Sequence, residues 1–130
     1  MILAIDPGSK KCGFAVLNET GKVMEHKVLE CHELSNCVPP LLSKYGIRII
    51  VIGQSTFGKA VERELVKLEV KASFIFIPEK NSSREARERY WAENPPSGLW
   101  KFIPTSLRVP PAPIDNYAAV ILGERFLNKR

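Results

Sequence analysis

The stretch ILAIDPGSKKCGFAV, residues 2–16, is the part of the chain that decides its expected fold. Four apolar residues lead into Asp6, and the turn residues Pro7 and Gly8 follow at once. A second apolar run begins at Gly13, so this stretch is typical of two short strands joined by a turn. A carboxylate at a strand end destabilises the fold unless it binds a partner. Mg²⁺ and Mn²⁺ are bound by oxygens of this kind. Asp6 is therefore a candidate metal ligand.

Two more acidic residues occupy comparable positions. Glu79 follows an apolar run, residues 74–77, and Asp115 stands at the head of the last helical pattern. Three segments that are distant in sequence could therefore deliver three carboxylates to one point and hold one or two metal ions for phosphodiester cleavage. Singly, each acid has a simpler explanation: Asp6 in a turn, Asp115 as a helix N-cap and Glu79 as a surface residue.

Alternation between strand-like and helix-like patterns predicts an α/β fold. The expected strands are residues 2–6, 13–17, 22–29, 47–52 and 73–77, and the expected helices are residues 34–45, 59–69, 82–92 and a last one from 115. The turn signal at residues 18–21 predicts an antiparallel hairpin, and Pro39 and Pro40 are expected to start or interrupt their helix. We expect a single domain over residues 1–130, with a central mixed five-stranded sheet whose first three strands are antiparallel, and with helices on both faces.

Composition narrows the class of protein. The 130 residues are 45% apolar and 25% charged, which is ordinary for a soluble globular protein. The apolar runs are shorter than the roughly 20 residues of a membrane span, and the N-terminal run is too short for a secretory signal. We therefore expect a cytoplasmic protein with no membrane partner. The net charge of +5 permits a polyanionic partner.

The cysteines favour reduced thiols over a metal site. Cys12, Cys31 and Cys37 are an odd number, as expected in a reducing compartment. Cys31 and Cys37, with His26 and His32 nearby, lack the paired CxxC spacing of a zinc site. Burial or chance explains them better than zinc does.

Basic residues follow two of the three acids. Lys10 and Lys11 come after Asp6, and Lys80 and Arg84 come after Glu79. Beside metal-binding carboxylates, such groups would hold the phosphate backbone of a nucleic acid. The alternative is a solvated helix face in which glutamates of the same segment are their partners.

These segments together resemble the YqgF (RuvX) and RuvC families of the ribonuclease H-like superfamily. The opening stretch resembles both families, and the segment around residue 79 is closer to YqgF. The matching pieces are Glu79-Lys80, Ser82-Ser83 and Glu85-Ala86, the strand-to-glycine segment Ile50–Gly53, and Asp115–Ala119, where an aspartate opens a helix with an Ala-Ala pair. The pieces occur in the family's order along nearly the whole chain.

The resemblance implies a metal-dependent nuclease that resolves Holliday junctions or processes ribosomal RNA. It implies that Asp6, Glu79 and Asp115 bind Mg²⁺ or Mn²⁺ and that the substrate is branched DNA or RNA. Lys11 and Lys80 would contact phosphate where YqgF members usually carry arginine, so the charge is kept but the bidentate fork is lost. Resolvases of this superfamily work as dimers, so a homodimer contact through the proline-rich residues 94–113 is one expectation.

Two rival functions remain open. One is a non-catalytic nucleic-acid-binding module that keeps the fold. The other is a nucleotide-binding P-loop at residues 53–60, GQSTFGKA, which has both glycines and the lysine at the required spacing. Ala60 stands there in place of the Ser or Thr that would bind Mg²⁺.

The aromatic residues in the stretch from Trp91 to Pro113 also allow two interpretations. Trp91, Trp100 and Phe102 could stack on unpaired bases, or they could fill a small core under a long loop.

Overall fold

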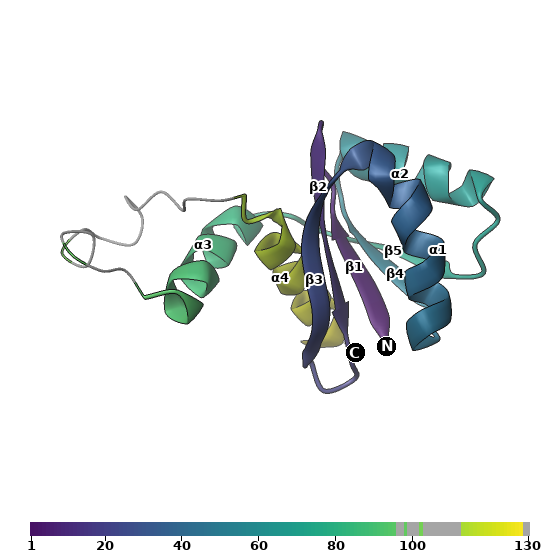
Figure 1. Ribbon diagram of the computed structural model, residues 1–130. Helices are drawn as coiled ribbons and strands as arrows, with labels where there is room; N and C mark the ends of the chain where they lie inside the picture. The colour runs from purple at the N-terminus through teal and green to yellow at the C-terminus, as the bar shows by residue number, and fades with distance from the viewer. Residues whose placement is uncertain (96–97, 99–101, 103–112, 129–130) are drawn as a thin grey trace.

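A computed structural model of the chain describes residues 1–95, 98, 102 and 113–128. Three strands come first, helices and strands then alternate, and two helices end the chain (Figure 1). The strands are β1 (Ile2–Asp6), β2 (Lys11–Leu17), β3 (Val23–Glu30), β4 (Ile49–Gly53) and β5 (Ser73–Ile77). The helices are the short 3₁₀ helix η1 (Cys31–Glu33), α1 (Leu34–Tyr45), α2 (Thr56–Lys67), α3 (Ser82–Glu93) and α4 (Asp115–Asn128). No helix in the described part of the chain has both the length and the apolar character that a membrane span needs.

The strands form one mixed sheet in the order β3-β2-β1-β4-β5. β1 pairs antiparallel with β2, and β2 pairs antiparallel with β3. β4 lies parallel to β1, and β5 lies parallel to β4. The predicted five-stranded sheet with three antiparallel strands first is therefore confirmed.

The central strand β1 is buried on both faces, because successive side chains alternate between two cores. Leu3 and Ile5 pack in a core with residues of α1 and α2, whereas Ile2 and Ala4 pack in a second core with residues of α4. Figure 1 shows α1 and α2 on one side of the sheet and α4 on the other, with α3 outside α4. The prediction of helices on both faces is confirmed.

The prolines of α1 neither start nor interrupt the helix, contrary to expectation. Pro39 and Pro40 lie inside the continuous element Leu34–Tyr45. Proline removes the hydrogen bond to the carbonyl four residues earlier, which here belongs to Ser35 and Asn36 in the partly exposed first turn. Water can reach carbonyls in that position, and the buried face of the helix keeps it in place.

Helix α2 begins three residues earlier than its apolar spacing predicts. Ser55 is the N-cap, and its side chain accepts a hydrogen bond from the backbone nitrogen of Gly58 at 3.1 Å. The helix therefore starts within the sequence GQSTFGKA, where a P-loop would have a longer phosphate-binding loop. Only Gln54 and Ser55 connect β4 to α2, and Lys59 already lies within the helix. This geometry argues against the P-loop alternative.

Candidate metal centre

The parallel strands bring two of the three acids to one edge of the sheet. β1 ends at Asp6, and β4 ends at Gly53, which pairs with Ile77 at the end of β5. Glu79 lies two residues beyond Ile77. A Cβ atom on Gly53 would lie only 2.0 Å from Glu79 Oε1, so the Glu79 side chain folds back over the end of β4. Glycine at position 53 leaves the space that this carboxylate occupies.

The third acid reaches the same edge from the end of a helix. Gly13 of β2 pairs with Asp6 of β1. A Cβ atom on Gly13 would lie 2.0 Å from the backbone oxygen of Asp115, the first residue of α4. The start of α4 thus rests directly on the strand position that neighbours Asp6. Among the described residues, no backbone N–H donates a capping hydrogen bond to the Asp115 side chain, so the simple N-cap explanation finds no support.

The negative charges of Glu79 and Asp115 act on Asp6. The pKa of Asp6 is raised from 3.8 to about 7, first by burial and then by the negative charges of Asp115 and Glu79. Burial also raises the pKa of Glu79. It raises the pKa of Asp115 as well, and the positive charge of Lys11 opposes that rise. Like charges that oppose one another's ionisation are what a bound divalent cation would relieve.

An unpartnered carboxylate oxygen at this edge suits a hard cation. Glu79 Oε1 is buried and has no hydrogen-bond partner. Burying an oxygen that has no partner costs desolvation free energy, and a metal ion bound to that oxygen would offset the cost. Asn116 Oδ1, next to Asp115 in sequence, is also buried without a partner, and its amide Nδ2 atom lies 2.9 Å from His26 Nδ1 of β3. Carboxylate and amide oxygens are the donors that Mg²⁺ and Mn²⁺ prefer, so the residues fit such an ion.

Sequence reasoning did not single out Asn116, which neighbours the candidate ligand Asp115. Its one signal was its place directly after Asp115.

The three acids form an open cluster. Within the described ranges, the one group of three potential ligands whose donor atoms all lie within 4.8 Å of one another is Glu30, His32 and Glu33. Asp6, Glu79 and Asp115 are therefore more widely spaced than this. In a two-metal site the ions are about 4 Å apart. Ligands that contact different ions therefore need not be close enough together to contact a common ion.

The Glu30 group itself has a structural explanation. Glu30 and Glu33 form a reciprocal capping box at the start of η1, and His32 Nδ1 lies 3.4 Å from Glu30 Oε2. Cysteine takes no part in this group, so the cluster lends no support to a zinc site. All three cysteines are free thiols.

The predicted phosphate contacts border the acids and are exposed. Lys11 begins β2, and its positive charge opposes the rise of the Asp115 pKa. Lys80 follows Glu79 directly, and Arg84 lies in the first turn of α3. Within the described part of the chain, the side chains of Lys80 and Arg84 have no hydrogen-bond or ion-pair partner. Glu85, one of their expected partners, binds Arg125 instead. The basic side chains are thus available to an anionic ligand.

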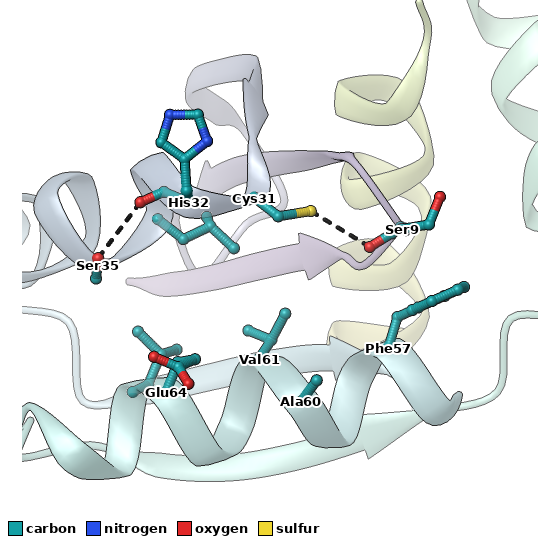
Figure 2. Close-up of a pocket in the computed structure, with 11 residues that line it drawn as sticks. Ser9, Cys31, His32, Ser35, Phe57, Ala60, Val61 and Glu64 are labelled. Carbon is teal, nitrogen blue, oxygen red and sulfur yellow. Dashed lines mark hydrogen bonds between the residues drawn. The ribbon is translucent and has the colours of Figure 1, made fainter.

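A pocket of about 500 Å³ adjoins the turn that follows Asp6 (Figure 2). Gly8 and Ser9 form one end, and η1, α1 and α2 form its walls. Figure 2 shows Cys31 pointing toward this turn, where its Sγ atom donates to Gly8 O at 3.3 Å. Phe57, at the start of α2, lines the pocket and is 47% exposed. An aromatic surface therefore lies beside the acidic edge.

The aromatic residues Trp91, Trp100 and Phe102 do not behave as one group. Phe102 is 77% exposed, so the expectation that it fills a small core is wrong. Trp91 contacts Tyr90 edge to face, with ring centroids 5.0 Å apart. Trp100 and most of the proline-rich residues 94–113 lie outside the described residues.

Replacing Gly53 by alanine is expected to impair the site and spare the fold. The added Cβ would displace the far end of the flexible Glu79 side chain, and the Gly53 backbone has no positive φ that alanine would resist. We expect Mn²⁺ affinity to fall about 10–100-fold, as when the support of a metal ligand is lost. Calorimetric titration with Mn²⁺ and urea unfolding check the two parts. Unchanged Mn²⁺ affinity in Gly53→Ala would contradict the placement of Glu79.

Comparison with known proteins agrees with this architecture. No curated protein sequence matches the chain. The structure of RuvC from Thermus thermophilus is similar over 93% of this chain and 88% of that one, with a TM-score of 0.58 and 12% sequence identity. A putative sugar kinase from Cytophaga hutchinsonii ATCC 33406 is similar over 69% of this chain and 39% of that one, with a TM-score of 0.44 and 14% identity. The likeness to RuvC shows that the fold is ribonuclease H-like, as the sequence predicted.

The sequence itself identifies the family. Residues 1–86 match the family described as the Tex protein YqgF-like domain. The matched region runs from β1 into α3 and contains Asp6, Glu79 and the intervening Gly53. Asp115 lies beyond it. The predicted membership is confirmed: the chain belongs to the family of Tex protein YqgF-like domains.

Proposed function

We propose that this protein is a divalent-metal-dependent endonuclease that cleaves structured nucleic acid, with Asp6, Glu79 and Asp115 as its metal ligands. One observation supports this most strongly. The buried Glu79 Oε1 atom has no partner, and the charges of Glu79 and Asp115 add to burial in raising the pKa of Asp6 to about 7. Membership of a YqgF-like family with a RuvC-like fold supports the nuclease class.

The chain's own residues divide the work in this mechanism. The three acids hold the metal, which, when bound, activates water and stabilises charge on the scissile phosphate. Asp6 must be deprotonated to act as a ligand, so metal binding releases a proton in the neutral pH range. Lys11, Lys80 and Arg84 hold the flanking phosphates and set the position of the strand.

The surroundings favour a substrate with unpaired or branched segments. The exposed ring of Phe57 lies beside the turn that follows Asp6, where it can stack on an unpaired base. A Holliday junction and a ribosomal RNA precursor both offer such segments next to paired ones. Homodimer formation through residues 94–113 stays a prediction, since most of that segment lies outside the described residues.

Cleavage of a small substrate panel tests the proposal. We expect cutting of a labelled four-way DNA junction, a single-stranded RNA or a ribosomal RNA precursor fragment with Mg²⁺ or Mn²⁺. Glu79→Gln should reduce it at least about 10³-fold, because the variant removes a charged metal ligand. Binding of the same substrate should persist in the variant. Binding without cleavage by the wild type, with either metal, would favour the non-catalytic module.

A further inference from the structure

We propose that Arg125 is a positioning residue for Glu79, because its guanidinium bridges the two backbone carbonyls that flank this residue. Arg125 Nη1 donates to Pro78 O at 2.9 Å, and Arg125 Nη2 donates to Lys80 O at 2.8 Å. The consequence for metal binding rests on the proposed function. The contacts themselves do not depend on it.

The turn that carries Glu79 lacks backbone partners at these two carbonyls. Ile77 O accepts from Gln54 N at 2.8 Å, and Glu79 O accepts from Ser82 N at 2.9 Å. Among the described residues, no backbone N–H does the same for Pro78 or Lys80. Peptide carbonyls normally find a partner, and here one side chain supplies both.

Arg125 is itself held in place by a helix on the other side of the turn. Its Nη2 atom lies 2.6 Å from Glu85 Oε2, and its side chain is 23% exposed. Arg125 lies in the second half of α4, and Glu85 lies in the first turn of α3. The planar guanidinium presents several donors in a fixed arrangement, so one side chain connects α4, the Glu79 turn and α3.

Its action on Glu79 is indirect. The described contacts of Arg125 are with the carbonyls and with Glu85, and burial is the cause of the raised Glu79 pKa. Arg125 therefore fixes where the Glu79 backbone lies, and Gly53 leaves room for the Glu79 side chain to turn into the site. Glutamate at the end of an unsupported turn would otherwise sample many positions.

The chain offers a matched control in Arg89. Arg89 binds Glu124 through two contacts, of 2.9 and 3.0 Å, and so joins the same pair of helices as Arg125 does. Arg89 has no described contact with the turn at residues 78–80. Loss of either arginine removes an ion pair between α3 and α4, but only loss of Arg125 frees the turn.

The experiment compares Arg125→Gln, Arg125→Lys and Arg89→Gln with the wild type. Exchange of the Ser82 amide hydrogen is measured without metal, because this amide bonds to Glu79 O and reports the turn directly. Affinity for Mn²⁺ alone is measured by calorimetry. Both Arg125 variants should exchange faster at Ser82 and bind Mn²⁺ about 10–100-fold more weakly, whereas Arg89→Gln should stay within about twofold of the wild type. Lysine should not rescue, since one ammonium group lacks the guanidinium's fork.

Three outcomes would overturn the inference. The first is a wild-type rate of Ser82 amide exchange in Arg125→Gln. The second is an effect of Arg89→Gln on exchange and Mn²⁺ affinity as large as that of Arg125→Gln. The third is full rescue by Arg125→Lys, which would mean that only the charge of Arg125 matters. If Arg125→Gln does not fold, Arg125→Lys decides through the same two measurements. Failure of the wild type to bind Mn²⁺ would count against the proposed metal centre, while the exchange at Ser82 would still decide whether Arg125 holds the turn.

Discussion

Replacing Asp6 by asparagine is expected to abolish cleavage and also to stabilise the metal-free protein at pH 8. Cleavage should fall at least about 10³-fold, because the variant loses a charged ligand of the metal. The gain in stability should be on the order of 1–4 kcal/mol, because the buried negative charge that the folded state resists is gone. A residue that costs stability and serves chemistry is common in active sites.

The pH dependence of this gain follows from the direction of the pKa shift. Asp6 has a folded-state pKa of about 7 against an ordinary value of 3.8, so the folded protein holds this proton more tightly than the unfolded chain does. The associated stabilisation is complete below about pH 4 and is lost as the pH rises through 7. The advantage of Asp6→Asn should therefore be large at pH 8 and close to zero at about pH 3.5.

Urea unfolding in the presence of a chelator, at both pH values, measures this effect. The chelator is needed because a bound divalent cation would stabilise the wild type and mask the difference. Asp115→Asn is a useful comparison, since Lys11 opposes the rise of the Asp115 pKa and the gain should be smaller. An Asp6→Asn protein that is no more stable than the wild type at pH 8 would show that Asp6 is not buried against other acids.

Replacing Gly13 by alanine should have the largest effect on folding. The added Cβ would lie 2.0 Å from Asp115 O, 2.1 Å from Asp115 C and 2.4 Å from Asn116 N. These are backbone atoms at the start of α4, and they cannot move aside without shifting the helix from the sheet. We expect the free energy of unfolding to fall by about 3 kcal/mol or more, at the upper end of the overpacking range.

A second glycine provides the control for this prediction. Gly21 has a φ of +90° and no atom within 4 Å of an added Cβ, so Gly21→Ala tests conformational strain without a clash. Its effect should be on the order of 1 kcal/mol. Urea unfolding of both variants decides between the causes. If Gly13→Ala were no less stable than Gly21→Ala, α4 would not rest on β2 as described.

Gly13 and Gly53 lie at the same edge of the sheet, but they serve different purposes. At Gly13 the obstacle is the backbone of α4, so alanine should damage the fold. At Gly53 the obstacle is the end of the Glu79 side chain, so alanine should damage metal binding. The difference between the two variants would separate the support of the site from the support of the fold.

Much of the fold could be predicted because local patterns and burial agree. The apolar runs gave the five strands, and the acid at the end of β1 was expected to meet acids from two later segments. The course of α1 through Pro39 and Pro40 was not predicted, because packing of its apolar face outweighs two lost hydrogen bonds. The early start of α2 depends on the cap at Ser55, which apolar spacing does not reveal.

The supports of the site were harder to predict than its acids. The acids stand at strand and helix ends, where sequence patterns are informative. Arg125 is 40 residues from Glu85 and 47 from Pro78 in the chain, so only the tertiary fold shows that it bridges the Glu79 turn. In the same way, Gly53 was recognised as a strand end, and the space that it leaves for Glu79 became evident only from the structure.

Titration of the protein with Mn²⁺, followed through the paramagnetic broadening of its backbone amide signals, tests the central claim most directly. A single metal centre built from three distant segments predicts early, simultaneous broadening around Asp6, Gly53, Glu79 and Asn116, and its loss in Asp6→Asn. Broadening centred on Glu30, His32 and Glu33, or spread evenly over exposed acids, would contradict the proposed metal centre.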